Sequence, residues 1–169
     1  EDPAARYRTV VGKIDLRNFS NKSLTTAWTS EMSGPNFAGR LVTLPENKAL
    51  ITFSDSEPYG ARQANGLFRP DDPDLLIGKV GLVDFSSGQF EIYSKGHRNP
   101  QGLFMTSTGE IYETEHGPKG GDELNLIVRG GNYGWPYESH GVDYGSYRWK
   151  HGDAGRHDNF DRPIFAWVP

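Results

Sequence analysis

The sequence predicts an all-β protein whose strands are short and regularly spaced. Short apolar runs alternate with turn residues along most of the chain, and almost no segment has the 3.6-residue apolar period of a helix. Glycine and proline contribute 21 and 11 of the 169 residues, and aromatic residues make up 12%. Many turns combined with many large flat side chains favour a sandwich, a barrel or a propeller that carries its function in long loops.

The strands are predicted from apolar runs bounded by turn residues. In chain order they are 7–16, 24–29, 37–44, 48–53, 79–85, 89–93, 102–106, 110–113, 123–128 and 164–169. Turns at 45–47, 86–88 and 107–109 contain Gly or Asn and join six of these strands into hairpins. The hairpins share one plan, and such a weak internal repeat is typical of propeller blades, which bury their faces only against neighbouring blades.

Two long segments, 55–77 and 130–162, interrupt this rhythm. The first is rich in Pro, Gly and Asp, and the second is rich in Gly, Tyr, His and Asp. Stretches of this length without regular structure are usually functional loops, and a disordered insertion is the alternative.

Charge and composition limit the classes of function. A net charge of −4 with scattered Lys and Arg is atypical of nucleic-acid binding, so no nucleic-acid partner is expected. No apolar run approaches the roughly 20 residues that span a bilayer, so no membrane span is expected. The absence of cysteine excludes disulfides and thiolate metal ligands. Residues 1–3 have neither the basic nor the apolar region of a signal peptide, and an earlier, removed one stays open.

The segment 96–136 is the densest in residues that could bind a ligand. Arg98 and Asn99 directly precede Pro100, which holds the backbone before it extended. Arginine offers a planar fork of donors, and asparagine adds a donor and an acceptor, so the pair suits an anionic or carbonyl-bearing ligand. An arginine packed against a neighbouring carboxylate is the alternative interpretation.

A second candidate site lies at 115–123, where acids surround a glycine-rich turn. Because Pro118 has no backbone N–H, the carbonyl groups of Gly117 and Pro118 can be presented together. Hard cations such as calcium prefer oxygen ligands of this kind. The spacing is not that of an EF-hand, so an ordinary glycine-rich turn is the alternative. Trp135, in the glycine-rich run 130–136, is predicted to plug the core at a tight turn.

Two strings stand in order with unbroken spacing between them: GHRNPQGL at 96–103 and EHGPKGGDELNLIVRGGNYGWP at 115–136. Together they resemble the core signature of the soluble quinoprotein glucose/sorbosone dehydrogenases, and the likeness covers about 34–143. The resemblance implies a six-bladed β-propeller, of which 1–169 form a partial domain of about two to three blades. It also implies that 96–143 hold pyrroloquinoline quinone chelated to a calcium ion.

The resemblance assigns roles residue by residue. Arg98 and Asn99 match residues that contact the quinone, and the carbonyls of Gly117 and Pro118 match those that bind its calcium. The positions that match ligands of further structural calcium sites are Glu123, Tyr133, Ser139, Gly141 and Asp143, where Ser139 and Gly141 act through backbone carbonyls.

The family's reaction is removal of a hydride from the anomeric carbon of an aldose, helped by a histidine base that an aspartate orients. In an ungapped alignment Asn36 takes the place of the histidine, and Asp55 keeps the place of the aspartate. The Asn amide cannot accept a proton, and general-base catalysis is typically worth about 10²–10⁴-fold. The sequence therefore predicts a catalytically lapsed member or a recruited base, and His97 and His116 lie in the retained motifs.

The expected function is thus quinone- and calcium-dependent oxidation of an aldose, with the sugar and an electron acceptor as partners. The alternative is a non-enzymatic propeller module that binds a sugar or a protein. A hydrolase that uses Asp122 and Glu123 is disfavoured, because adjacent residues on a strand point to opposite faces. A periplasmic or secreted location is expected, and open strand edges predict self-association or a further chain that completes the ring.

Overall fold

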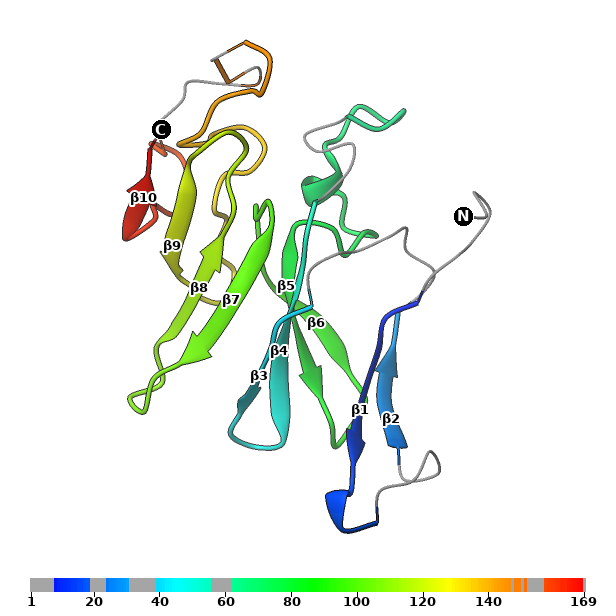
Figure 1. Ribbon diagram of the computed structural model, residues 1–169. Coiled ribbons are helices and arrows are strands. Elements are labelled where there is room, and N and C mark those ends of the chain that lie inside the picture. Colours follow the sequence, from blue (N-terminus) through cyan, green and yellow to red (C-terminus); the bar gives the residue numbers. More distant parts are fainter. Residues whose placement is uncertain are drawn as a thin grey trace.

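The computed structural model describes residues 8–18, 24–30, 39–55, 62–146, 148–149, 151 and 157–168. These residues form three antiparallel sheets, which stand side by side in Figure 1. The first sheet pairs β1 (Val10–Ile14) with β2 (Leu24–Thr29). The second contains β3 (Leu41–Leu44), β4 (Lys48–Phe53), β5 (Lys79–Asp84) and β6 (Phe90–Lys95) in sequence order. The third contains β7 (Pro100–Met105), β8 (Ile111–Glu115), β9 (Asp122–Leu126) and β10 (Phe165–Trp167).

The central strands of the second sheet, β4 and β5, are buried on both faces because the neighbouring sheets cover them. Leu50 of β4 packs with Ile111 and Ile127 of the third sheet. The next residue, Ile51, points the other way and packs with Phe53 and with Val11 of the first sheet. Since side chains alternate between the faces of a strand, one apolar run supplies two interfaces. This is why β4 is buried at five of its six positions.

The sheets are arranged as the blades of a β-propeller, as the sequence predicts. The two four-stranded sheets are meanders, and their first strands, β3 and β7, contact each other (Figure 1). The backbone N–H of Asp55, just after β4, donates a hydrogen bond to the carbonyl of Arg98, just before β7, at 2.6 Å. Neighbouring sheets therefore pack face against face, which is the packing rule of such repeat architectures.

An aromatic contact joins the first sheet to the second. The rings of Trp28 and Phe90 stack with their centroids 4.2 Å apart. The Phe90 ring lies directly over Gly81 of β5, where a Cβ atom would come within 2.2 Å of it. Glycine is therefore required at this position, because any side chain would expel the ring that packs against the first sheet.

The predicted hairpins are confirmed, with shifts at the ends of some strands. The first strand is shorter than the predicted 7–16, because a short 3-10 helix, η1 (Leu16–Asn18), follows Ile14. In the turn between β3 and β4, Glu46 and Asn47 have φ values of 58° and 61°. Positive φ at both central residues matches the right-handed twist of a hairpin, and Asn tolerates this conformation well.

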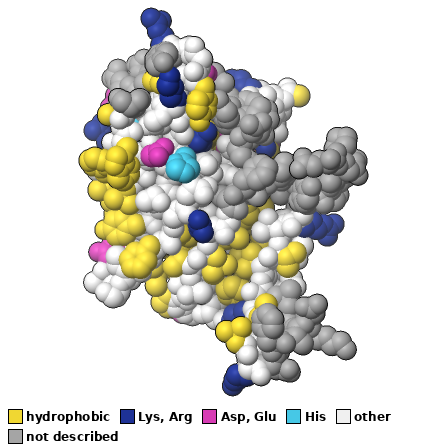
Figure 2. All heavy atoms as spheres, in the orientation of Figure 1, with side chains coloured by type: hydrophobic (Ala, Val, Ile, Leu, Met, Phe, Trp, Pro, Cys, Tyr) yellow, Lys and Arg dark blue, Asp and Glu magenta, His cyan; other side chains and the backbone are white. Residues whose placement is uncertain are grey.

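The long loops contain no strand in their described parts. Between β4 and β5 the described residues contain one 3-10 helix, η2 (Arg69–Asp71). β10 forms one edge of the third sheet. Large apolar side chains in and beside this strand are exposed and form the yellow patch at the left edge of Figure 2. Its members, each 52–65% exposed, are Ile164, Phe165, Trp167 and Val168.

Candidate functional site

The site is built on the face of the third sheet that turns toward the second sheet. On β8 the inward positions are Ile111, Glu113 and Glu115, and on the β9 segment they are Glu123, Asn125 and Ile127. The strand register places Glu113 opposite Asn125 and Glu115 opposite Glu123. This face is therefore apolar at one end and becomes acidic toward the loops that follow β8.

A single amide lies among the three buried carboxyl groups. The Nδ2 group of Asn125 donates to Glu113 and Glu115 at 3.1 Å and approaches Glu123 at 3.4 Å. Burial, followed by the neighbouring Glu115, raises the pKa of Glu113 well above its usual range. The same two causes raise the pKa of Glu123 to about 9. Since like charges this close cannot all ionise in a dry interior, the cluster requires bound protons or a bound cation.

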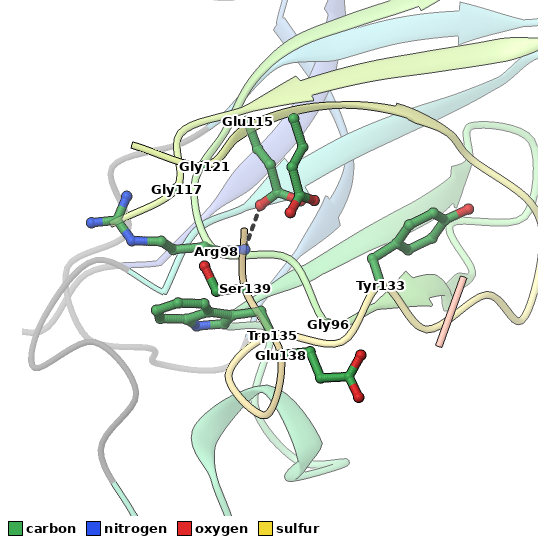
Figure 3. Close-up of a pocket in the computed structure, with 10 residues that line it drawn as sticks. Gly96, Arg98, Glu115, Gly117, Gly121, Tyr133, Trp135, Glu138 and Ser139 are labelled. Carbon is green, nitrogen blue, oxygen red and sulfur yellow. Dashed lines mark hydrogen bonds between the residues drawn. The ribbon is translucent and has the colours of Figure 1, made fainter. Parts of the chain in front are cut away.

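Glu115 holds the backbone of the Arg98–Asn99 pair. Its Oε2 atom accepts hydrogen bonds from the N–H groups of Arg98, at 2.5 Å, and Asn99, at 3.2 Å. Figure 3 shows the first of these bonds as a dashed line. The carbonyl of Asn99 in turn accepts the N–H of His116 at 3.1 Å. The two motifs, far apart in the sequence, are thus joined by one buried carboxylate.

The side chains of this pair are held from outside the sheet. The Arg98 guanidinium donates from Nη1 to the His116 carbonyl at 2.9 Å and lies 5.7 Å from the centre of the Trp135 ring. The Asn99 Oδ1 atom accepts a hydrogen bond from Gln101 Nε2 at 2.8 Å. An arginine fixed in this way holds its guanidinium plane in one direction, as recognition of an anionic group requires.

Five of the predicted site residues line one cavity, which Figure 3 shows. Its walls are formed by Gly96, Arg98, Glu115, Gly117, Gly121, Glu123, Tyr133, Trp135, Glu138 and Ser139. Asn99 and Pro118 do not line the cavity themselves, but each directly follows a lining residue in the chain, Arg98 and Gly117. Gly141 and Asp143 do not line it: Asp143 Oδ1 accepts the N–H of Gly145 at 3.0 Å in a local turn.

Gly141 instead supports the loop that carries the predicted calcium ligands. A Cβ atom on Gly121 would lie 2.0 Å from the Gly141 nitrogen, so the two backbones are in direct contact. Backbone hydrogen bonds in both directions between Lys119 and Val142, at 3.1 and 3.2 Å, fix the same contact. The loop that follows β8 is therefore shaped by close backbone packing, which glycine alone permits.

The donor set of this loop fits calcium. Gly117 and Pro118 are both buried, and within the described residues no hydrogen bond is made to either of their carbonyl oxygens. Asp122 anchors the loop, because its Oδ1 atom accepts the Gly117 N–H at 3.1 Å. Two neighbouring carbonyl oxygens of this kind are ligands that a hard cation prefers.

Asp55 is a fully buried structural anchor at the end of β4. Its Oδ2 atom accepts the indole N–H of Trp135 at 2.9 Å, and its Oδ1 atom lies 3.5 Å from Nη1 of Arg69. Together with the backbone bond to Arg98, these contacts place Asp55 at the second sheet's border with the cavity wall. Asn36, predicted to stand in the place of the base, lies outside the described residues.

The structure separates the two histidines considered as a recruited base. His97 is 0% exposed, stacks on Tyr133 at 4.8 Å and lies 2.9 Å through Nε2 from Ser94 Oγ, so it has no access to a substrate. His116 has a side chain that is 59% exposed, and its Nδ1 atom lies 3.1 Å from Asp122 Oδ2. Of the two, only His116 has a solvent-exposed ring.

Asp122 and Glu123 diverge, as the alternation along a strand predicts. Asp122 turns outward to His116, whereas Glu123 turns inward to Asn125. An acid–base pair made of these two residues is therefore excluded by their directions.

Sequence reasoning missed Glu113, Glu115 and Asn125. The signal for them was present, because they occupy alternate positions with Ile111 and Ile127 in the segments 111–115 and 123–127. Acids that share the face of buried isoleucines are predicted to be buried themselves. The alternation along these two segments is therefore enough to indicate a polar interior on this face.

The fold and the cavity define a class of protein: a β-propeller with a buried acidic cluster beside an arginine and a glycine-rich loop. Residues 2–169 match the family model described as glucose/sorbosone dehydrogenase. The chain belongs to the glucose/sorbosone dehydrogenase family, and the family predicted from the two motifs is confirmed.

Curated relatives match the chain over parts of their own lengths. It is 38% identical over 124 residues to quinoprotein glucose dehydrogenase B of Acinetobacter calcoaceticus, which covers 59% of this chain and 25% of that protein. It is 31% identical over 145 residues to the aldose sugar dehydrogenase YliI of Escherichia coli, covering 80% of this chain and 38% of that protein. The chain thus matches well under half the length of either relative.

Solved structures confirm the fold. A glucose dehydrogenase crystal structure superposes with a TM-score of 0.74 at 26% identity, covering 94% of this chain and 48% of that one. The apo-form of the soluble aldose sugar dehydrogenase from Escherichia coli superposes with a TM-score of 0.71 at 23% identity, covering 96% and 54%. Among the described residues, no helix has the length and apolar character needed to cross a membrane.

Proposed function

We propose that this chain supplies the cofactor-holding part of a quinone- and calcium-dependent oxidoreductase that oxidises aldose sugars at the anomeric carbon. The observation that carries the proposal is that Arg98 from one motif and Gly117 from the other both lie in the lining of the same small cavity (Figure 3). The 38% identity to a protein named as a quinoprotein supports pyrroloquinoline quinone as the cofactor.

Each predicted contact has a defined part in this proposal. The carbonyls of Gly117 and Pro118 would bind the calcium ion, and Arg98 and Asn99 would bind polar groups of the quinone. When bound, the quinone supplies an acceptor for two electrons and the hydrogen of the anomeric C–H bond. Glu115 is a positioning residue, because it holds the backbone of the Arg98–Asn99 pair and is bonded to both N–H groups.

His116 is our proposed proton acceptor. It stands between Glu115 and Gly117, which line the cavity, although its own side chain does not line it. That side chain is 59% exposed on the outward side, where Asp122 lies 3.1 Å from its Nδ1 atom. A carboxylate at Nδ1 leaves Nε2 free to accept the proton of the anomeric hydroxyl group as the C–H bond breaks. This role would replace the histidine whose family position is taken by Asn36.

The test is reconstitution of the full protein with pyrroloquinoline quinone and Ca²⁺, followed by dye reduction with a panel of aldoses. Wild type should bind the quinone and turn over at least one aldose. We expect His116→Asn to lower kcat by about 10²-fold or more while quinone binding persists, because only the base is lost. His151→Asn is the matched control, since His151 packs against Trp149 and Phe68 away from the cavity lining.

Each outcome decides a separate part of the proposal. Absence of quinone binding in the wild type would refute the cofactor assignment. Binding with no turnover, restored by Asn36→His, would show a lapsed dehydrogenase and would rule out His116 as an effective base. Binding of sugar without quinone binding would favour the propeller as a non-enzymatic binding module.

The remaining expectations belong to the same proposal. An electron acceptor must re-oxidise the reduced quinone, and a periplasmic or secreted location suits an enzyme that uses external sugars. The exposed apolar side chains around β10 (Figure 2) are the kind of surface that a neighbouring blade covers. We therefore propose that further strands, from this protein or from another chain, pack on this edge.

A further inference from the structure

One buried lysine has its ammonium group surrounded by backbone carbonyls. Lys79, the first residue of β5, is only 2% exposed. Its Nζ atom donates to the carbonyl oxygens of Asp72 at 2.8 Å, Leu75 at 2.5 Å and Ile77 at 3.5 Å. Because an ammonium group has three N–H donors, the three carbonyls of this one turn account for all of them.

The ammonium group keeps its charge in this position. Burial lowers the pKa of Lys79 to about 8, so the charged form still prevails at neutral pH. The acids that face it are Asp72, Asp71 and Asp55, and the cation beside it is Lys95. A buried charge is tolerated where hydrogen bonds replace the lost water. The carbonyls of the turn do this for Lys79, as the carbonyls of a loop do for a bound metal ion.

The turn continues the segment that begins at η2, and the first residue of η2 supports the cavity wall. The segment 69–78 lies beyond the upper ends of β4 and β5 in Figure 1. At its start, Nη1 of Arg69 lies 3.5 Å from Oδ1 of the buried Asp55. The other oxygen of Asp55 accepts the indole N–H of Trp135, which lines the cavity. A single carboxylate therefore connects the start of the segment to the cavity.

The end of the segment contacts the chain directly before Arg98. The carbonyl of Gly78 accepts the N–H of His97 at 3.1 Å. An added Cβ atom on Gly78 would lie 2.8 Å from Pro70 of η2 and 2.8 Å from the carbonyl oxygen of His97. The segment is therefore closed on itself and packed against the backbone that carries Arg98.

Asp71, the last residue of η2, joins the segment to the loop after the cavity wall. Its Oδ2 atom accepts the hydroxyl group of Tyr137 at 2.5 Å, and its Oδ1 atom lies 3.2 Å from Nζ of Lys95. The ring of Phe68 meets the ring of Tyr137 edge-on, with centroids 5.0 Å apart. Tyr137 follows Trp135 by two residues. Loosening of the segment should therefore reach the cavity from this side as well.

We propose that the Lys79 ammonium group is an internal cation that holds the segment 69–78 against the cavity wall, which makes Lys79 a positioning residue of the cofactor site. The charge is attached to β5 through the lysine side chain, so the segment is ordered without a bound ion. The proposal takes the cofactor from the proposed function, whereas the order of the segment can be measured in protein without quinone.

The wild type gives the first test. NMR of the full protein with ¹⁵N-labelled lysine should show an ammonium group whose protons exchange slowly with water at neutral pH, because Nζ of Lys79 is buried and hydrogen-bonded. The signal should vanish in Lys79→Met. It should persist in Lys48→Met, the matched control, because Lys48 lies at the opposite end of the β4–β5 pair. A wild type without such a signal would overturn the proposal.

Hydrogen exchange measures the order of the segment. In Lys79→Met, the amides of Asp72 and Leu75, which are bonded within the segment, should exchange about tenfold faster or more, while those of β4 and β5 stay protected. Quinone affinity should fall by a similar factor, and Lys48→Met should change neither quantity.

The outcomes separate this proposal from the proposed function. Wild-type exchange in Lys79→Met would overturn the internal cation, and wild-type quinone affinity with a released segment would overturn the positioning role. A wild type that binds no quinone while the segment is ordered would refute the cofactor assignment, and the positioning role with it.

Charge and length can be separated because the sequence has no cysteine. Lys79→Cys, alkylated with bromoethylamine in the unfolded state and then refolded, carries an ammonium group on a side chain of nearly the length of lysine. Alkylation with bromopropane gives a neutral side chain of the same length. The first should restore slow exchange and quinone affinity, and the second should restore neither. Equal recovery with both would overturn the proposal, and this pair decides the question even if Lys79→Met does not fold.

Discussion

The second and third sheets have the same four-stranded meander, but their buried side chains differ in kind. They are mostly apolar in the second sheet and include several acids in the third. On β4 and β5 of the second sheet, nearly every side chain is buried, and most of them are apolar. On the facing strands of the third sheet, β8 and β9, the buried positions include Glu113, Glu115 and Glu123. The second sheet stabilises the fold through buried apolar surface, whereas the third sheet carries buried acidic groups that an apolar core would exclude.

The difference shows how a repeated scaffold acquires a site. Backbone hydrogen bonding and strand order are alike in both sheets, so the fold itself does not specify the function. Three glutamates and one asparagine on a single face provide the acidic cluster and hold the Arg98–Asn99 pair. Loops at that end then complete the cavity.

The largest loss in the free energy of unfolding is expected for a substitution in the apolar core of the second sheet. Phe53 is 1% exposed and makes edge contacts with the rings of Trp28 and Phe90. Phe53→Ala should lower the free energy of unfolding by about 3–5 kcal/mol, because it removes buried surface and leaves a cavity. Urea denaturation measures this loss, and Phe53→Leu should lose markedly less. Equal losses in the two variants would show that packing volume is not what Phe53 contributes.

An intermediate loss of stability is expected at Glu115, which accepts the backbone N–H groups of Arg98 and Asn99. Glu115→Ala leaves the N–H groups of Arg98 and Asn99 without their acceptor, at a cost of about 1–3 kcal/mol in unfolding free energy. Glu115→Gln keeps an acceptor oxygen for these two N–H groups but turns an NH2 group toward the Asn125 Nδ2 donor, so it should recover only part of that stability. Quinone affinity, measured by fluorescence titration, should follow the same order. Wild-type affinity in the alanine variant would remove Glu115 from the proposed cofactor site.

The smallest effect at neutral pH is expected for Glu113→Gln. Burial raises the pKa of Glu113, so the fold favours the neutral form of this carboxyl group, and a neutral amide of the same shape should change the free energy of unfolding by less than about 1 kcal/mol.

The pH dependence of this variant tests the same cause. A raised folded pKa means that the unfolded chain, with an ordinary value near 4.5, releases its proton first as pH rises. The contribution of Glu113 to the stability of the wild type therefore falls as pH rises above about 4.5, and it continues to fall up to the folded pKa. Urea titrations at several pH values should show the variant gaining on the wild type across this range. Parallel curves would mean that Glu113 titrates normally in the folded state.

Much of the fold could be predicted from local patterns. The hairpins at 45–47, 86–88 and 107–109 follow from turn residues between apolar runs, and the structure confirms them. The shorter β1 could not be predicted, because the 3-10 helix that follows it continues an apolar-polar pattern compatible with a strand. Strand ends depend on which backbone groups find partners, and sequence alone does not show that.

The site was predicted less completely, for a similar reason. The motifs located Arg98 and Gly117, which the structure brings to one cavity. Contacts between distant segments were not predictable, such as the 2.9 Å bond between Trp135 and Asp55 or the approach of His157 to Glu123. Residues 80 positions apart meet only because two sheets pack together, and this depends on the whole topology.

Glu115 accepts two hydrogen bonds, from the backbone N–H groups of Arg98 and Asn99, and these bonds also affect the entropy of ligand binding. Fixing the backbone of one residue costs about 1–2 kcal/mol in conformational entropy. In this protein the cost for two residues that we propose contact the cofactor is met when β8 forms, in advance of ligand binding. A ligand that binds there does not have to order the loop, so more of its contact energy is expressed as affinity.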